Sequence, residues 1–576
     1  MRGAEPMDPQ AERRWWLRAE TGLLAAAFVV CVAAIRQDLP WGVNVDEPGW
    51  VPVAVRLASS GDLSPHWFGH PGSTVIYPLA LISHLWHAWT QGGRLLGADP
   101  ALWIHFQEAP AAYYVLGRLL AIAYLLLAMG LTMRVGRRLG GRDMGLVAAA
   151  VLPLSALLIS YAVMVRSDTA GVCFMALIAL AFLRLAERGD RRSAALAGLA
   201  VGLGISTRYF LAVQALPLAL LAWRPPRRRP AGPGADARTP PHDHGRAWRV
   251  AVALLAAAGA FLASTPFALR EPEVLRLNLA MEARGTSLGA DGLGPLGNLA
   301  WYLEQGLPRL LPWPLLLLGL AGLVLLSRRA WGVPGSWVVG AGALLHLLAS
   351  CALPLHWDRW LLQLLPALGL GAAASLCSAW RAMADRWGRR PWTWAFASVA
   401  LLTLLIAAAR PAAERLGHLR HPGSRAAATL WLATELRPGE RVLTEDFGPY
   451  AFGEDMRAGY GPAHWDHWQA FAGGEAKRLP QLAAAAAEGR LETADDGYVV
   501  LSSFVYGPVL AEPRRFPVQA DFYRRALDCV PAASFGSREG PELRILRGGD
   551  LAACLDRSVA AERTPNAASG AGGVSP

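Results

Sequence analysis

The sequence predicts a polytopic α-helical membrane protein that carries a small α/β domain near its C-terminal end. Of its 576 residues, 53% are hydrophobic and 17% are charged, and the mean hydropathy is +0.28. These values are too apolar for a soluble chain whose apolar groups must fit into one core. Apolar runs of membrane-spanning length recur as far as residue 410. Beyond that point the apolar content falls, and short strand-like and helix-like segments alternate.

Apolar runs of roughly 17 to 25 residues are interpreted as membrane spans, because a helix of that length crosses the hydrocarbon core. The sequence gives about eleven of them, of which the fifth is short. They cover residues 19–35, 112–133, 144–163, 169–186, 194–206, 209–223, 249–268, 309–326, 335–353, 360–379 and 392–409.

Arginine clusters orient these spans. All of them fall on one side of the membrane if residues 1–18 are cytoplasmic. The first span lacks an obvious small-residue cleavage site, so we expect it to remain as an anchor. Because the net charge of +11 comes from arginines beside spans, it does not indicate nucleic-acid binding. The clusters are Arg13, Arg14 and Arg18; Arg134, Arg137, Arg138 and Arg142; Arg188, Arg191 and Arg192; Arg224 and Arg227 to Arg229; Arg328 and Arg329; and Arg381, Arg386, Arg389 and Arg390.

One further apolar stretch, residues 73–89, is expected to lie in the headgroup interface. It mixes His84 and His87 with two tryptophans, a composition that suits an interfacial helix better than a span or a metal site. A span here would also move every later arginine cluster to the outer side. Residues 37–110 are therefore predicted to form one large external loop.

The external C-terminal domain is expected to cover residues 411–558. Its strand-like runs are 498–505 and 542–546, and its helix-like runs are 424–436 and 521–527. Cys529 and Cys554 both fall in it, so an oxidising compartment makes a disulfide plausible. The cytoplasmic loop 224–248 and the tail 559–576 are low in complexity and are expected to be disordered. No Cys/His ligand set appears, so no metal site is predicted, although a divalent metal is not excluded.

Polar residues are distributed asymmetrically in this topology. The cytoplasmic turns hold mainly arginine, whereas the external segments mix acids, arginine, histidine, asparagine and tyrosine. Acids and cations together at one membrane face are suited to group transfer from a lipid-borne donor. The external segments are 37–110, 166–168, 207–209, 269–308 and 356–359.

Four segments in chain order support a family resemblance. They are NVDEPGWVPVAVRLASSGDLSPHWFGHPGSTVIYPL, VMVRSDTAGVCFMALIALAFLRL, GLAVGLGISTRYF and HWDRWLLQLLPALGLGAA. Together they resemble the GT-C glycosyltransferases, and within that clan the protein O-mannosyltransferases and their bacterial relatives, including the lipid A aminoarabinose transferases. The resemblance covers roughly residues 15–410.

The resemblance implies transfer of a sugar from a polyprenyl phosphate carrier to an acceptor hydroxyl, with inversion at the anomeric carbon. Asp46 occupies the place of the family's catalytic base, which must remove the hydroxyl proton. Arg359 stands where the family has an arginine, and its planar fork suits the leaving phosphate. Arg208 stands where relatives often have lysine. His70 departs from a lysine of the aminoarabinose transferases, which puts a phosphate contact there in doubt.

Asp168 and Glu47 are further candidates for the acid role, and Arg166 is a further candidate for the phosphate role. A structural alternative remains open for each assignment. Asp168 resembles the second acid of the family, yet it could form only a turn ion pair with Arg166, itself a candidate phosphate ligand. Asp46 could cap a helix that begins at Pro48. Glu47 is a catalytic candidate that could instead pair with a cation such as Arg56. Arg359 could be an interfacial anchor or could pair with Asp358.

Aromatic and amide side chains on the external side are candidate sugar or acceptor contacts. Trp41, Trp50 and Trp67, with His66 beside them, could stack on the apolar face of a sugar ring. Interfacial anchoring is the alternative role for these tryptophans. Tyr209 and Asn278 complete the set of candidate contacts.

The sequence therefore predicts an integral-membrane glycosyltransferase of a bacterial inner membrane, with a cytoplasmic N-terminus and a periplasmic C-terminal domain. Its partners would be a polyprenyl-phosphate-linked sugar, membrane lipids and an acceptor that could be a protein, a glycan or a lipid. No soluble cofactor is required. A transporter or lipid flippase is the alternative from another class, but no internal repeat is evident. A ligase that uses an undecaprenyl diphosphate donor is a third hypothesis.

Overall fold

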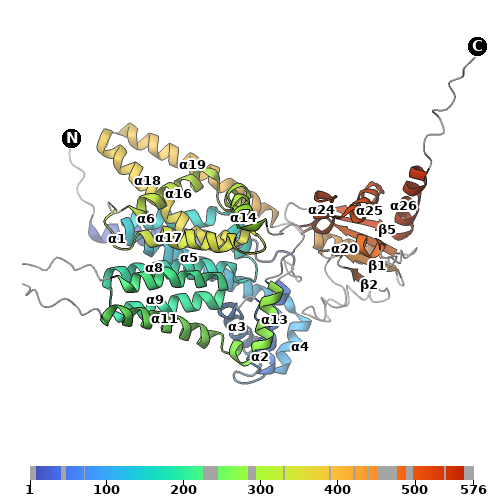
Figure 1. The fold of residues 1–576 in the computed structure, drawn as a ribbon, viewed down its shortest axis with the longest axis horizontal. Helices are drawn as coiled ribbons and strands as arrows, with labels where there is room; N and C mark the ends of the chain where they lie inside the picture. Colours follow the sequence, from blue (N-terminus) through green and yellow to red (C-terminus); the bar gives the residue numbers. More distant parts are fainter. Residues whose placement is uncertain are drawn as a thin grey trace, which may run out of the picture. The chain divides into compact units, whose positions relative to one another are not determined.

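The structure is a computed structural model. Contacts divide it into a helical unit of residues 1–36, 49–103 and 112–420 and a second unit of residues 37–48, 104–111 and 421–576 (Figure 1). The structure describes residues 8–39, 47–69, 72–224, 244–282, 293–328, 331–387, 391–419, 423–437, 440–445, 447–449, 476–479, 481–487, 497–536 and 540–563.

Helices account for nearly all regular structure before residue 420. The first group is α1 Pro9–Val32, η1 Glu47–Gly49, α2 Val51–Ser60, α3 Ser73–Gln91, α4 Pro100–Glu108, α5 Pro110–Gly140, α6 Arg142–Val151, η2 Leu152–Leu154, α7 Ala156–Ala162, α8 Ser167–Arg188, α9 Arg191–Thr207, η3 Tyr209–Gln214 and α10 Ala215–Trp223. The second group is α11 His244–Ser264, α12 Phe267–Arg270, α13 Pro272–Glu282, α14 Gly294–Trp301, η4 Tyr302–Gly306, α15 Leu307–Leu310, α16 Trp313–Ser327, α17 Trp337–Cys351, η6 Asp358–Leu364, α18 Leu365–Trp387 and α19 Pro391–His418.

This is a multi-pass membrane protein. Among the described residues, 5 helices are long and apolar enough to cross a bilayer, or up to 7 if two bent helix pairs each count as one span. Each of the eleven predicted spans falls on one or more helices, but the number eleven stays a prediction. The interfacial segment is the helix α3, which is not among the candidate spans.

Small residues let the central helices approach closely. Helices α8, α9 and α11 lie side by side (Figure 1), and α9 contributes Gly198 and Gly202, four residues apart. A Cβ atom on either glycine would lie 2.1 Å from a carbonyl oxygen of α11, that of Ala253 or Ala257. Glycine is therefore required at this small-xxx-small contact, which is the usual way that membrane helices pack.

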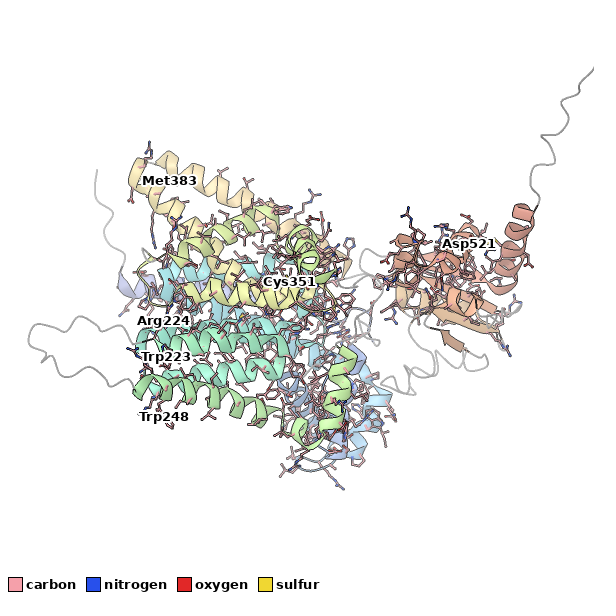
Figure 2. All side chains as sticks on the ribbon, viewed as in Figure 1. Trp223, Arg224, Trp248, Cys351, Met383 and Asp521 are labelled. Carbon is pink, nitrogen blue, oxygen red and sulfur yellow. A yellow bond between two sulfur atoms is a disulfide. The ribbon has the colours of Figure 1, made fainter. Side chains whose placement is uncertain are left out.

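At one end of the helical unit, an arginine connects two neighbouring helices. Trp223, Arg224 and Trp248 lie together there, where α10 ends and α11 begins (Figure 2). Arg249 ties the two helices by donating to the carbonyl oxygens of Ala222, at 3.1 Å, and Arg224, at 3.2 Å. These contacts satisfy carbonyls that a helix end leaves without partners.

The second unit contains a five-stranded sheet in the order β2-β1-β3-β5-β4. Strands β2 Ala476–Leu479, β1 Arg441–Glu445 and β3 Gly497–Ser502 are parallel. Strand β5 Leu543–Arg547 pairs antiparallel with β3, and β4 Ala533–Phe535 pairs antiparallel with β5. The helices of this unit are α20 Ser424–Glu435, α23 Leu482–Ala487, α24 Ser503–Ala511, α25 Pro517–Asp528 and α26 Gly548–Arg563. The predicted small α/β domain is confirmed, and its Cys529–Cys554 disulfide is formed.

Several predicted boundaries were wrong. The strand expected over 498–505 ends at Ser502, and α24 follows because Val505, Tyr506 and Val509 turn one helical face into the core. Pro411 lies inside α19 instead of opening the second domain. The alanine-rich end of α26 stays helical to Arg563, five residues into the expected disordered tail. Likewise α11 begins at residue 244, inside the loop expected to be disordered, most of which is outside the described residues.

Candidate functional site

The candidate site is built around Asp168, a carboxylate with no exposed surface. Its Oδ2 accepts a hydrogen bond from Arg166 Nε at 3.0 Å, and its Oδ1 lies 3.0 Å from Arg208 Nη2. Arg166 and Arg208 are themselves 2% and 5% exposed. One buried acid therefore holds two buried arginines, so the ion pair expected with Arg166 is only half of the arrangement.

The local sequence explains how Asp168 and Arg166 meet. Arg166 has extended backbone angles directly before α8, and Asp168 lies in the first turn of that helix. A carboxylate is stabilised there by the positive end of the helix dipole. The Arg166 guanidinium also lies over the Tyr161 ring, 5.5 Å from its centroid, while the Tyr161 carbonyl accepts from Thr169 Oγ1 at 2.9 Å. Helix α7 thus fixes the start of α8.

Arg208 reaches the same place from the turn between α9 and η3. Its Nε donates to Ser167 Oγ at 3.3 Å, beside Asp168. Glycine is required at position 171, because a Cβ there would lie 2.7 Å from Gln363 Nε2 and 3.3 Å from Arg208 Cδ. The sequence 207–209 therefore forms a turn that packs its arginine against the first turns of α8.

Arg359 approaches the cluster from the start of η6. Its guanidinium lies 4.7 Å from the centroid of the Trp357 ring, and it interacts electrostatically with Asp168 and Arg208. Asp358 does not neutralise it, because Asp358 Oδ2 lies 3.7 Å from Arg309 Nη1 instead. Arg359 is thus supported by an aromatic ring.

The site has more cationic than anionic groups. Among the described residues, Arg166, Arg208 and Arg359 surround the carboxylate of Asp168, so within this part of the chain the cations outnumber the anion by two. Two buried donors, Arg208 Nη1 and Arg359 Nε, have no hydrogen-bond partner among the described residues. Buried donors are normally satisfied, and a planar guanidinium matches phosphate or carboxylate oxygens. This arrangement is suited to binding an anion.

Sequence reasoning missed several neighbours of the site. Tyr161 interacts electrostatically with Arg166, Arg359 and Asp168. Arg415 of α19 donates from Nε to Ser160 Oγ, next to Tyr161. Its position near the end of a long helix gave no sequence signal, because only the tertiary fold brings α19 to α7.

The candidate aromatic and amide contacts lie in and around the segment before α3. Trp50 is 2% exposed and packs edge-on against Trp67, with ring centroids 5.5 Å apart. Tyr209 donates from its hydroxyl to the Phe68 carbonyl at 2.9 Å, and the Phe68 N–H donates to Asn278 Oδ1 at 2.6 Å. The candidate contacts described by the structure are therefore neighbours, joined through Phe68. Contact of Trp50, Trp67, Tyr209 and Asn278 with a sugar or acceptor stays a prediction.

Three predicted site residues, Asp46, Trp41 and His70, lie outside the described residues. Glu47 opens η1, has no exposed surface and belongs to the second unit. The interfacial histidine His87 is also buried, and its Nδ1 lies 2.9 Å from Asp99 Oδ2. Its hydrogen bond lowers the pKa of Asp99 against the opposing effect of burial.

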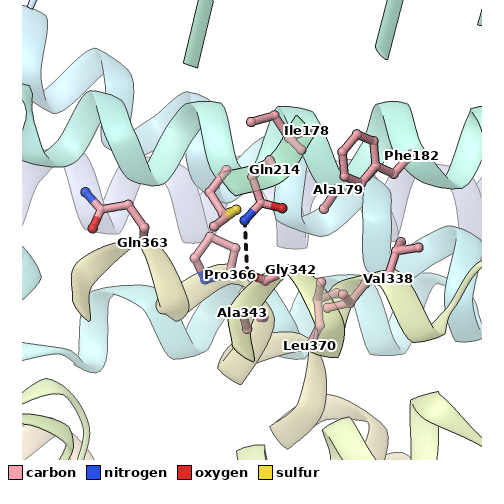
Figure 3. A pocket seen from close by; sticks show the side chains of 13 residues that line it. Ile178, Ala179, Phe182, Gln214, Val338, Gly342, Ala343, Gln363, Pro366 and Leu370 are labelled. Atoms are coloured by element: carbon pink, nitrogen blue, oxygen red, sulfur yellow. Dashed lines mark hydrogen bonds between the residues drawn. The ribbon is translucent and has the colours of Figure 1, made fainter. Parts of the chain in front are cut away.

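A small, mainly apolar cavity lies between α8, η3, α17, η6 and α18 (Figure 3). Gln214 crosses one side of it and donates from Nε2 to the Gly342 carbonyl at 2.9 Å. Aliphatic and aromatic side chains such as Ile178, Phe182 and Leu370 form most of its wall. Within the described residues, no group of three or more His, Cys, Asp or Glu side chains could hold a metal ion.

Comparisons with known proteins place this arrangement in a family context. The family model described as dolichyl-phosphate-mannose-protein mannosyltransferase matches residues 115–231, which include Arg166, Asp168 and Arg208. The structure of ArnT from Cupriavidus metallidurans bound to undecaprenyl phosphate is 15% identical with a TM-score of 0.50, and the match covers 91% of this chain and 97% of that one. The family model thus matches the segment that carries this cluster, and the fold of the chain is similar to that of ArnT.

Two further solved structures are similar to this GT-C chain. The apo form of the same ArnT is 14% identical with a TM-score of 0.49, and the match covers 94% of this chain and 99% of that one. The Archaeoglobus fulgidus oligosaccharyltransferase tethered to an acceptor peptide is 12% identical with a TM-score of 0.48, covering 91% and 74%. No curated protein sequence matches the chain. The GT-C fold predicted from the sequence is confirmed.

Proposed function

We propose that this GT-C protein is an inverting glycosyltransferase that moves a sugar from a polyprenyl-phosphate carrier to an acceptor hydroxyl on the outer face of the membrane. The observation that carries the proposal is the excess of arginine around Asp168 among the described residues, where the buried donors Arg208 Nη1 and Arg359 Nε have no hydrogen-bond partner. The likeness to ArnT, whose structure contains undecaprenyl phosphate, supports a lipid phosphate as the anion.

The charge of the site suits the product more than the substrate. A glycosyl phosphodiester carries one negative charge, whereas the phosphate monoester left after transfer carries close to two. A surplus of two positive charges therefore gains most interaction energy as the bond between the anomeric carbon and the phosphate oxygen breaks. Preorganised cations that bind developing charge lower the barrier of such a step.

The acceptor hydroxyl needs a general base that removes its proton. In the proposed reaction the Asp46 carboxylate takes the proton of the acceptor hydroxyl while its oxygen bonds to the anomeric carbon, and the electron pair of the broken bond leaves with the phosphate. Arg359 and Arg208 bind that phosphate. Arg166 and Asp168 hold Arg208 in place. Glu47 remains a second candidate acid, and His70 a further phosphate contact.

The proposed location is a bacterial inner membrane, with the N-terminus cytoplasmic and the α/β unit periplasmic. The Cys529–Cys554 disulfide supports this orientation, because disulfides persist in oxidising compartments. The sugar and the acceptor are not specified by these residues. Selection of the acceptor is a role that the α/β unit could fill.

A transfer assay tests the proposal. Purified full-length protein is incubated with labelled undecaprenyl-phosphate hexoses or aminoarabinose and an envelope extract, and release of undecaprenyl phosphate is measured. We expect release by the wild-type protein and its loss in Asp46→Asn. Movement of the labelled lipid across a vesicle membrane without release would support the flippase alternative instead. A requirement for a diphosphate-linked donor would support the ligase alternative.

A further inference from the structure

His66 is a charged residue that the proposed reaction does not use. Its Nε2 lies 2.9 Å from Asp62 Oδ2 and its Nδ1 lies 2.9 Å from Glu271 Oε2. An ionised carboxylate can only accept hydrogen bonds, so both ring nitrogens must donate. Only the doubly protonated imidazolium has two donors, and the geometry therefore selects the charged form of His66.

His66 lies in the middle of the segment 61–69, here called the strap, which leads from α2 towards α3. The strap is fastened near its start by the Ser64 hydroxyl, which donates to Glu271 Oε1 at 2.5 Å, and by the Tyr77 hydroxyl, which donates to the Leu63 carbonyl at 3.0 Å. The backbone of His66 has a φ of +50°, a region that few non-glycine residues adopt. The ring contacts of His66 thus hold a bend that the chain does not favour by itself.

The far end of the strap holds the turn that carries Arg208. Phe68 is buried, and its carbonyl accepts from the hydroxyl of Tyr209, the residue after Arg208. On the other flank, Thr207 Oγ1 lies 2.8 Å from the hydroxyl of Thr74 in the first turn of α3. Hydrogen bonds with the strap and with the start of α3 therefore hold the Arg208 turn on both sides.

We propose that the His66 imidazolium is a positioning residue that fastens the strap to Glu271 and so holds Arg208 in the geometry that binds the carrier phosphate. The inference rests on the proposed function, because it takes a lipid phosphate as the ligand of Arg208. It goes further in making phosphate binding depend on the protonation of a residue that does not touch the phosphate.

The direction of the pH dependence follows from the groups that face His66. In the described part of the chain these are Asp62 from the strap and Glu271 between α12 and α13, and Tyr77 of α3 interacts electrostatically with the same two carboxylates. Hydrogen bonds to Asp62 and Glu271 raise the pKa of His66, while the Ser64 N–H and His66 lower the pKa of Asp62. Burial raises the pKa of Tyr77 to about 12, so its hydroxyl stays neutral.

A group whose pKa is raised in the folded state contributes fully below its ordinary pKa and loses its contribution as the pH rises through the raised value. The contribution of His66 to holding the strap is therefore complete below the ordinary histidine pKa and is lost as the pH rises through the raised value. As the pH falls, the contact between His66 and Asp62 lasts until Asp62 is protonated. Because the pKa of Asp62 is lowered, this happens below the ordinary range of a carboxyl.

The test is the affinity of the purified full-length protein for undecaprenyl phosphate, measured between about pH 6 and about pH 9 so that the range spans the ordinary histidine pKa. The wild-type affinity should fall by roughly twofold to tenfold with rising pH, the scale of one or two exposed ion pairs. His66→Arg keeps a charged double donor and should retain its affinity at alkaline pH. His66→Phe should bind weakly at every pH. The lipid phosphate itself titrates, so the ratio of wild type to His66→Arg is the deciding quantity.

A second measurement does not depend on the ligand. The protection of the Phe68 amide, which donates to Asn278, is its exchange rate relative to the base-catalysed rate of an unprotected amide at the same pH. This protection should fall with rising pH in the wild type and be low at every pH in His66→Phe. Glu271→Gln should lower the pH at which both changes occur. Identical pH profiles for wild type and His66→Arg, or wild-type affinity in His66→Phe, would overturn the inference. If Arg359→Ala also bound undecaprenyl phosphate like the wild type, the proposed function itself would fail.

Discussion

Each unit has a carboxylate with no exposed surface, Asp168 in the helical unit and Glu445 in the α/β unit, and the two are satisfied in opposite ways. Asp168 in the helical unit is held by the cations Arg166 and Arg208. Glu445 in the α/β unit accepts from neutral donors, the Leu482 N–H at 3.1 Å, the Ser502 N–H at 2.9 Å and the Tyr523 hydroxyl. Burial and the charge of Glu445 raise the pKa of Tyr523, so this hydroxyl remains a donor.

The difference separates a binding site from a structural contact. The three described donors to Glu445 are neutral and come from α23, the end of β3 and α25, so the carboxylate joins three elements of the unit. Around Asp168 the cations exceed the anions, and donors of Arg208 and Arg359 stay unpaired within the described residues. A satisfied buried network stabilises a fold, whereas an excess of buried charge persists where it has a ligand.

Asp168→Asn should have the largest effect, because it leaves two buried arginines without their carboxylate. Breaking a buried ion pair costs about 3–5 kcal/mol, so we expect that loss of stability in the helical unit. Thermal unfolding in detergent measures it. Asp143→Asn is the matched control, an exposed acid in the first turn of α6. Equal unfolding temperatures for the two variants would remove the contrast with Glu445.

Arg359→Ala should lower kcat/KM for transfer by roughly 100-fold, about 2.7 kcal/mol, without destabilising the helical unit. The reason is that Asp358 keeps its own partner, Arg309. Arg276→Ala, which removes an exposed arginine of α13, serves as the control and should change kcat/KM little. A loss of stability instead of activity in Arg359→Ala would make the arginine structural.

Glu445→Gln should destabilise the α/β unit by about 1–3 kcal/mol, since one acceptor becomes a donor facing other donors. Faster hydrogen exchange in β1 and β3 would report this. Binding of undecaprenyl phosphate by the folded protein should stay unchanged. Reduced binding with unchanged exchange would show that Glu445 serves the site and not the fold.

Tyr523→Phe should have the smallest effect, about 1 kcal/mol, because it removes one of the hydrogen bonds to Glu445 and leaves the ring in place. The same exchange experiment measures it. A cost as large as that of Glu445→Gln would mean that the phenol is the main partner of the carboxylate.

The sequence predicted the helices and strands of this molecule better than the contacts between them. Apolar runs and arginine clusters indicated the helices, and alternation indicated the strands, because each is set by local periodicity. The resemblance singled out Asp168, Arg208 and Arg359, which the structure brings together. Their convergence could not be read from periodicity, because it depends on how α8, η3 and η6 pack.

Other features carried no local signal. The strap was read only as loop, since the bond between His66 and Glu271 joins residues 205 positions apart. Arg415 meets Ser160 across 255 positions. Pro411 was taken as a domain boundary, but the chain accommodates it inside α19. Such contacts are properties of the tertiary fold, which pattern reasoning on one sequence does not reach.

The most direct test of the central claim is a cryo-electron microscopy structure of the full-length protein with undecaprenyl phosphate. The account predicts phosphate oxygens within about 3 Å of Arg208 Nη1 and Arg359 Nε, the buried donors that now lack partners. A phosphate bound elsewhere, with both donors still unpaired, would contradict it.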